Sequence, residues 1–224
     1  MSATSQRRSA KAGHLPAENI DGRTARARAT RARIISAATA LFTTAGYTAT
    51  SIGTIAANAR VSEQTVYYAF GTKRAVLTVA LDQAVAGDDE PVPTLERPWA
   101  REALAAADPG EQIQRHVAAA ADIYLRAAAL LDVVRSAAAV EPELAEVWAT
   151  NLEQRRTIAR VFAQTLADKT ALREAMSIDT AADIILTVLA PETYRLLVND
   201  CGWEHPRWQQ WTTDALCRLL ITSP

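Results

Sequence analysis

Apolar residues recur at helical spacing along most of the chain, beginning near residue 26. Four of them share one stripe at steps of three and four residues: Ile34, Ala38, Leu41 and Phe42. Gly46 follows the last periodic position, and glycine adopts at little cost the left-handed conformation that often ends a helix. The pattern therefore predicts a first helix over about 26–45.

Three shorter helices are predicted next, each beginning after a hydroxyl side chain that can accept a hydrogen bond from exposed backbone N–H groups. The capping residues are Thr50 or Ser51, then Ser62, and then Thr72. The residues expected to face inward are Ile52, Ile55, Ala56 and Ala59 in the first helix, Val66 and Phe70 in the second, and Val76, Leu77 and Ala80 in the third. Gly71 separates the second of these helices from the third.

The third of these helices and everything after it, residues 73–224, are predicted to form a larger helical domain. The stretch 87–98 holds three prolines and four acids, which indicates a connecting loop. Helical periodicity resumes over about 99–107, 113–138, 141–166, 180–199 and 206–222. Pro191 removes a backbone donor inside one of these helices and should kink it. With no strand pair and no internal repeat, the predicted fold class is all-α.

Composition supports a helical globular protein, since 49% of the residues are apolar and only 8 of the 224 are glycine. The sequence has no apolar run long enough to span a membrane, and residues 1–25 lack the apolar centre of a secretory signal. Cys201 and Cys217 show no metal-ligand spacing. We therefore expect a cytoplasmic protein without a metal or cofactor.

The charge is divided unevenly along the chain. Residues 1–80 hold 11 Lys and Arg against 3 acids, a net charge of +8, whereas residues 81–224 hold 13 bases and 22 acids, a net charge of −9. This division favours an N-terminal part that meets a polyanion such as nucleic acid. A solvated basic tail is the alternative, because residues 1–25 mix Ser, Ala, Arg and Gly without periodicity and are predicted to be a disordered basic arm.

Residues 46–77 carry the strongest functional signal. Two helices of seven or eight residues joined by about three match a helix-turn-helix, whose second helix enters the DNA major groove. That helix needs an apolar inner face and an outer face of hydrogen-bonding groups. The residues left for the outer face after Ser62 are Glu63, Gln64, Thr65, Tyr67 and Tyr68. A phenol can donate to phosphate while its ring packs on a sugar or a thymine methyl group.

The segment "ARIISAATALFTTAGYTATSIGTIAANARVSEQTVYYAFGTKRAVL", residues 32–77, resembles the DNA-binding segment of the TetR family of transcriptional regulators. The matching elements stand in order: Leu41–Phe42, Gly46–Tyr47, Thr50–Ser51, Ile55–Ala56, Ala59, Val61–Ser62, Thr65–Val66–Tyr67, Phe70, Lys73 and Leu77. The resemblance implies a three-helix DNA-binding domain over about 26–72, followed by a helical regulatory and dimerisation domain over 73–224.

Carried over residue by residue, the resemblance implies that the second helix of the helix-turn-helix contacts base edges and the DNA backbone through Gln64, Thr65, Tyr67 and Tyr68. Glu63 would lie beside the groove. Thr50 or Ser51, together with Lys73, would hold phosphates, and helix N-termini favour phosphate on physical grounds. Each residue also has a plainer interpretation: Tyr67 half-buried between helices, Lys73 a surface lysine, and Thr50 and Ser51 simple caps.

Three positions depart from the family pattern. Gly53 stands where relatives often carry arginine, Glu63 places a negative charge beside the groove, and Ala69 offers only a methyl group where relatives often have a larger side chain. The operator sequence is therefore not predicted.

The resemblance also implies a homodimer through the last two helices, over about 180–222, and a small-molecule pocket among the central helices. Two broad apolar faces support the dimer, with Trp208 and Trp211 as anchors, although an ordinary internal core would give the same periodicity. The candidate pocket residues are His116, Tyr124, Trp148, Glu192 and Tyr194. Ordinary packing is the alternative role for each of them.

The sequence thus predicts a ligand-responsive regulator that binds a palindromic double-stranded DNA operator as a dimer, and that acts as a repressor. The alternative is a helical small-molecule-binding protein that has lost DNA binding, which Gly53, Glu63 and Ala69 would favour. An enzyme is a weaker alternative. No phosphate-binding glycine loop, zinc-ligand spacing or nucleophile elbow is present, so we expect no catalytic residues.

Overall fold

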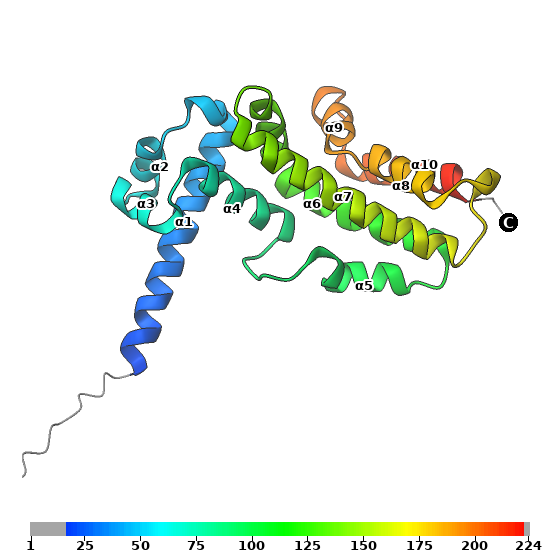
Figure 1. Cartoon of the computed structure of the whole chain (residues 1–224), viewed down its shortest axis with the longest axis horizontal. Coiled ribbons are helices and arrows are strands. Elements are labelled where there is room, and N and C mark those ends of the chain that lie inside the picture. The colour runs from blue at the N-terminus through cyan, green and yellow to red at the C-terminus, as the bar shows by residue number, and fades with distance from the viewer. Residues whose placement is uncertain (1–16, 222–224) are drawn as a thin grey trace, which may run out of the picture.

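The computed structural model describes residues 17–221, and residues 1–16 and 222–224 lie outside the described range. Helix α1 (Ala17–Ala49) begins well before the expected start near residue 26. Residues 17–25, which the sequence analysis placed in the basic arm, are therefore helical. Alanine, glutamate and arginine, which make up part of this stretch, have high helix propensity. The N-terminal turns of α1 project away from the other helices (Figure 1).

The next three helices agree closely with the prediction. They are α2 (Ile52–Ala59), α3 (Glu63–Phe70) and α4 (Lys73–Ala86). Thr72 caps α4 by accepting from the Ala75 N–H at 3.0 Å. Gly46 interrupts α1 with φ 81° and ψ 171°, a conformation that strongly favours glycine. The glycine that the sequence placed at a helix end is thus the point where the chain turns toward α2.

Helices α1 to α4 are called the N-terminal head here. The remaining helices form an elongated bundle beside it (Figure 1). Two long helices, α6 (Pro109–Ala138) and α7 (Pro142–Ala167), run the length of this bundle. The shorter elements are the 3-10 turns Thr94–Glu96 and Arg173–Ala175, α5 (Pro98–Ala105), α8 (Ile178–Val188), α9 (Pro191–Tyr194), the π-helical segment Arg195–Asp200 and α10 (His205–Leu220). Within residues 17–221, no helix combines the length and apolar character needed to cross a bilayer.

The helix expected over 180–199 is divided in the structure. It breaks at Leu189 and Ala190, where the chain becomes extended before Pro191 starts α9. Proline disfavours a helical conformation in the residue before it, which explains a break where the sequence predicted only a kink. The backbone then continues as a π-helix.

One continuous hydrophobic core joins the head to the bundle, from Ile34 in α1 to Leu220 in α10. No change in packing marks the expected boundary at residue 72, because α4 packs against both α1 and α6. Trp208, expected as an anchor between subunits, is fully buried in this chain's own core. Its ring packs edge-on against Tyr124 and Tyr194, at centroid distances of 5.8 and 4.9 Å. The internal-core interpretation of that residue is therefore the correct one.

Candidate nucleic-acid interface

Side-chain caps fix the ends of α2 and α3. Ser51 accepts from the Thr54 N–H at 3.0 Å, and Thr54 returns the interaction by accepting from the Ser51 N–H at 3.0 Å. Ser62 accepts from the Thr65 N–H at 3.1 Å. Between the helices, Arg60 adopts the left-handed conformation (φ 54°), which ends α2. These local bonds hold the turn of the helix-turn-helix, because they satisfy backbone groups that the short helices leave free.

Helix α3 is held by its inner face and presents its tyrosines outward. Val66 is fully buried against the head, whereas the side chain of Tyr68 is 93% exposed and that of Tyr67 is 50% exposed. Neither phenol forms a hydrogen bond within the part of the chain that the structure describes. Two phenol groups without internal partners on one exposed helix face are available to bind a ligand that offers acceptors, such as a phosphate backbone.

Glu63 and Gly53, two of the departures from the family pattern, lie against each other. A Cβ atom built on Gly53 would be 2.8 Å from the Glu63 Oε1 atom. The carboxylate therefore occupies the space that a side chain at position 53 would need, so the two departures form one local feature. Gln64 is exposed on the next position, and the half-buried Thr65 places its Oγ1 2.8 Å from the Ser62 Oγ.

The two predicted phosphate contacts before α2 differ in exposure. Thr50 is 2% exposed, and its hydroxyl donates to the Gly46 carbonyl at 2.8 Å. Ser51 is exposed at the N-terminus of α2. Of the pair, only Ser51 reaches the surface, and Thr50 serves the turn at the end of α1.

Lys73 has an internal role that the sequence did not reveal. Its Nζ donates to the carbonyls of Tyr47 and Thr50, each at 2.9 Å, and lies 4.0 Å from the centroid of the Tyr47 ring. Burial lowers the pKa of Lys73, and the charge of Glu141 opposes that shift. The plain surface-lysine interpretation is therefore wrong. The ammonium group binds two backbone carbonyls and lies over an aromatic ring, so a phosphate contact by Lys73 stays a prediction.

Helix α1 carries five arginines. Arg31 donates to the Ala69 carbonyl at 2.9 Å and stacks on the Phe70 ring at 4.2 Å, which ties the end of α3 to α1. Four others on this helix are exposed: Arg23, Arg26, Arg28 and Arg33. Arg28 lies 3.9 Å from Asp89, and both side chains are largely exposed, so this pair adds little stability. The four exposed arginines make the N-terminal half of α1 positively charged.

Two connected cavities lie between the bundle helices, far along the chain from α3. The inner cavity has a volume of about 110 Å³ and the outer one about 650 Å³, and they share Val85, Trp99, Ile123 and Asn151 among their lining residues. Of the five predicted pocket residues, His116 and Tyr124 line the inner cavity. Burial lowers the pKa of His116 to about 3, so its imidazole is neutral near pH 7.

The other three predicted pocket residues lie elsewhere. Trp148 and Glu192 border a separate space of only about 10 Å³. Tyr194 packs in the aromatic cluster with Trp208, and its hydroxyl lies 3.1 Å from the His205 Nδ1. Trp99, Asn151 and Arg155 are among the residues that line the inner cavity and that the sequence analysis missed. The signal of Asn151 and Arg155 was weak, because polar residues within a helix such as α7 usually face solvent.

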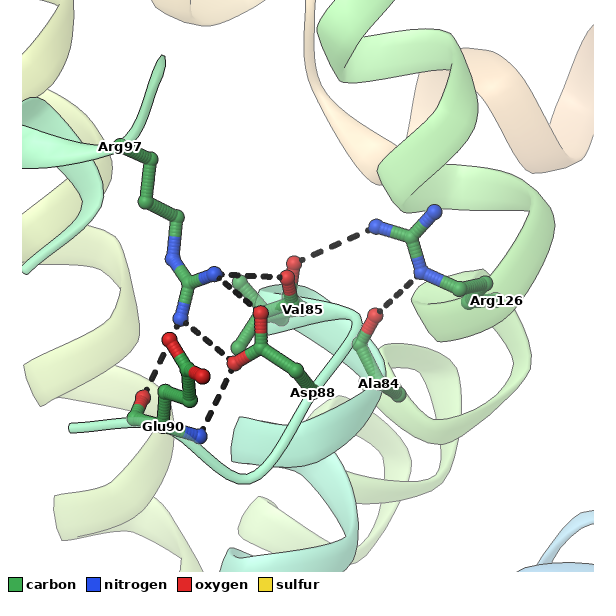
Figure 2. Close-up of polar contacts among 7 residues, drawn as sticks. Ala84, Val85, Asp88, Glu90, Arg97 and Arg126 are labelled. Carbon is green, nitrogen blue, oxygen red and sulfur yellow. Dashed lines mark hydrogen bonds and ion pairs between the residues drawn. The ribbon is translucent and has the colours of Figure 1, made fainter. Parts of the chain in front are cut away.

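A set of arginine contacts holds the C-terminal end of α4 to the bundle (Figure 2). Arg97 binds both carboxylate oxygens of Asp88, at 2.8 and 3.1 Å, and also donates to the carbonyls of Ala86 and Glu90. Arg126 of α6 donates to the Ala84 carbonyl at 3.1 Å. Asp88 holds the pKa of the Arg97 guanidinium above its usual value, mainly through their hydrogen bonds. The end of α4 that lines both cavities is thus fixed to α5 and α6.

Comparison with known proteins finds a family model that matches the N-terminal head. Residues 34–80 match the model for bacterial regulatory proteins of the tetR family. A search of curated protein sequences found no match. The matched residues span the end of α1 through most of α4, so they include every predicted DNA contact. Regulators of this family are in general not enzymes, in agreement with the expectation from the sequence.

Solved structures share the fold over most of the chain. NalD of Pseudomonas aeruginosa, the secondary repressor of the MexAB-OprM multidrug efflux pump, has 16% identity and a TM-score of 0.67, over 88% of this chain and 100% of that one. The TetR-family regulator PfmR of Thermus thermophilus has 22% identity and a TM-score of 0.62, over 83% and 97%. A gamma-butyrolactone receptor has 20% identity and a TM-score of 0.56, over 88% and 90%. Residues 34–80 therefore match the model for the tetR family of bacterial regulatory proteins, and the chain has the fold of the TetR-family transcriptional regulators.

Proposed function

We propose that the chain is a ligand-responsive transcriptional repressor that binds a palindromic operator as a homodimer. The observation that carries the DNA-reading part is the outward display of Tyr67 and Tyr68 on a helix that Val66 anchors. In this proposal Gln64, Thr65 and the two tyrosines contact base edges and backbone, with Glu63 at the edge of the groove. Ser51 and the third proton of Lys73 bind phosphates, and the arginines of α1 add attraction that does not depend on sequence.

An exposed apolar stripe on α10 supports the homodimer. Trp211 and Leu219, two turns apart on one face, are 39% and 43% exposed, and the half-buried Ala215 lies between them. Leu196 of the π-helical segment is 53% exposed. Large apolar side chains gathered on one helix face are the usual centre of a subunit interface. A two-fold dimer would place two copies of α3 about 34 Å apart, or a multiple of that distance, and would therefore require a palindromic site.

The repressor role and the ligand response rest on the cavities and on likeness of fold. NalD, which shares the fold, is a repressor, and the gamma-butyrolactone receptor responds by name to a small molecule. In this chain Val85 of α4 lines both cavities, while Lys73 at the opposite end of the same helix holds the carbonyls before α2. A ligand that displaces the C-terminal end of α4 would, through Lys73, move the turn that precedes α2.

DNA binding is tested with the protein's own upstream sequence in a gel-shift assay over a range of salt concentrations. We expect affinity to fall steeply with salt, and Tyr68→Ala to weaken operator binding by about tenfold or more while dimerisation and helix content are unchanged. Tyr68→Phe separates the contribution of the hydroxyl from that of the ring. Lys73→Ala is a poor probe by itself, because it also removes two internal hydrogen bonds.

Unchanged affinity in Tyr68→Ala would refute the contact assignment. Binding that is absent or insensitive to salt in the unaltered protein would instead favour the alternative, a helical ligand-binding protein without DNA binding. That alternative depends on the departures at Gly53, Glu63 and Ala69, since Gly53 has no side chain to reach the duplex and Glu63 brings a negative charge beside it.

A further inference from the structure

The inner cavity contains one charged side chain that has no partner of opposite charge. Arg155 of α7 lines this cavity, and no aspartate or glutamate lines it. Its Nε donates to the Asn151 Oδ1 at 3.0 Å, and its guanidinium lies 5.1 Å from the centroid of the Trp148 ring. Within residues 17–221, Arg155 forms no ion pair, and its two terminal nitrogens donate no hydrogen bond. The planar end of the guanidinium, which binds carboxylates with two parallel bonds, is therefore free.

The rest of the inner cavity is apolar or neutral. Ile158, Ile185 and Leu189 supply aliphatic surface, and Trp99 supplies an aromatic wall. His116 is 7% exposed, and its ring stacks on Phe162 at a centroid distance of 3.7 Å. Within residues 17–221, His116 forms no hydrogen bond, so its ring nitrogens are available to a ligand in the cavity. A neutral imidazole offers one donor and one acceptor and can therefore bind a polar group of the ligand.

The acids near this region border the outer cavity. Asp82, Glu90 and Glu153 line the outer cavity and do not line the inner one. Arg97 also lines the outer cavity, but its guanidinium is already paired with Asp88. A positively charged ligand would therefore be favoured at the outer cavity and opposed at the inner end by Arg155. A ligand with a single negative charge can pair with Arg155 only if that charge reaches the inner cavity.

The size of the inner cavity limits the apolar part of the ligand. A dry cavity of roughly 150 Å³ in another protein holds one benzene molecule, and the inner cavity here is about 110 Å³. The connected outer cavity of about 650 Å³ leaves room for a longer body. The inner cavity thus fits a narrow group, either the edge of a fused aromatic ring or an alkyl chain.

We infer that the effector of this regulator is a hydrophobic monocarboxylate whose carboxylate pairs with Arg155 and whose narrow apolar body lies between Trp99 and Ile158. This inference rests on the proposed ligand response and adds the chemical class of the ligand. Both fused aromatic acids and acyl-chain acids have this chemistry, and the two sources are separated by the choice of probe.

Isothermal titration calorimetry of the full-length protein tests the inference without DNA. The probes are 2-naphthoate and decanoate, the neutral amides 2-naphthamide and decanamide, and the cation 2-naphthylmethylammonium. We expect at least one carboxylate to bind about tenfold or more tightly than its own amide, because a charged hydrogen-bonding pair is lost in the amide. The cation is expected to bind most weakly. A preference for naphthoate indicates an aromatic acid, and a preference for decanoate an acyl chain.

Arg155→Met removes the charge and keeps much of the stem, and Arg155→Lys retains the charge. We expect Arg155→Met to abolish the preference for carboxylate over amide while amide binding persists, which also shows that the cavity is intact. Arg155→Lys should keep part of the preference. The matched control is Arg156→Met, which alters an exposed arginine on the adjacent position, outside the inner cavity. It should leave the preference unchanged.

Three results would overturn the inference: equal binding of carboxylate and amide, tighter binding of the cation, or no binding by any probe. Loss of the preference in Arg156→Met but not in Arg155→Met would place the anion site elsewhere and would overturn it as well. A gel-shift assay without ligand is run in parallel. DNA binding without carboxylate binding refutes this inference alone, whereas carboxylate binding without DNA binding refutes the proposed regulator function alone.

Discussion

His116 should make the stability of the protein depend on pH between about 6.5 and 5, above the range in which most carboxylates titrate. Its ring lies on α6 against Phe162, and burial lowers its pKa from 6.5 to about 3. In the unfolded chain the same imidazole takes up a proton near pH 6.5. Between these values the unfolded state binds the extra proton, so the free energy of unfolding must fall as the pH falls from about 6.5 toward 3.

The magnitude follows from the shift. Each pH unit below 6.5 and above the folded-state pKa costs about 1.4 kcal/mol, so at pH 5 this single histidine lowers the free energy of unfolding by about 2 kcal/mol relative to pH 7.5. His116→Leu is neutral at both values and should lack this loss. The measurement is urea-induced unfolding at pH 7.5 and pH 5. Protein concentration is held fixed, because dimerisation would make stability depend on it.

Val117→Ala serves as the control, since it destabilises the same helix at a fully buried position and leaves His116 in place. It should show the full loss of about 2 kcal/mol between pH 7.5 and pH 5 despite its lower starting stability. If His116→Leu and the unaltered protein lose the same free energy to within about 0.5 kcal/mol, the burial argument for His116 is refuted.

Two further predictions concern the backbone and the joint at α4. Gly46→Ala should cost about 1–3 kcal/mol from backbone strain alone, because the new Cβ meets nothing within 4 Å, whereas Gly22→Ala inside helical α1 should stabilise by up to about 1 kcal/mol. Thermal unfolding checks the opposite signs, and a matching sign in both variants would contradict them. In a double-mutant cycle, Arg97→Met and Asp88→Ala should each lower the urea midpoint, and the double variant should lose clearly less than the sum of the two, since the pair is bidentate. Strictly additive losses would show that the two residues act independently.

Local chemistry explains which parts of the fold could be predicted from sequence. Helices α2, α3 and α4 each begin beside a hydroxyl cap, and Gly46 and Gly71 both take positive φ angles, as their positions between helices indicate. Caps and glycines act within three or four residues of their own position, so a single sequence contains the whole signal. The outward face of α3 was predictable for the same reason, because Val66 and its neighbours obey one helical period.

Contacts between distant segments were not predictable in this way. Lys73 looked like a surface lysine or a phosphate contact, and only the fold brings it within 2.9 Å of two carbonyls that lie more than twenty positions earlier. Trp208 has the spacing of an interface residue and of a core residue alike, and the packing of Tyr124 and Tyr194 around it decides for the core. Arg155 likewise became a candidate only when α7 was placed against α6 and α8, because its helix carries many exposed polar residues.

Under the proposed function, α4 would carry the effect of a bound ligand to the DNA-binding helices. A 14-residue helix transmits a displacement as a rigid body, because bending it would break backbone hydrogen bonds. Its first residue, Lys73, is bound to the turn that precedes α2, and its last turn carries Val85 at the cavities and the carbonyls that Arg97 and Arg126 hold. A ligand beside Val85 therefore cannot shift the end of α4 without also straining the arginine contacts or moving the turn before α2. Since α2 follows that turn and α3 packs against α2, the second outcome would change the position of the two exposed tyrosines, and operator affinity would report that change.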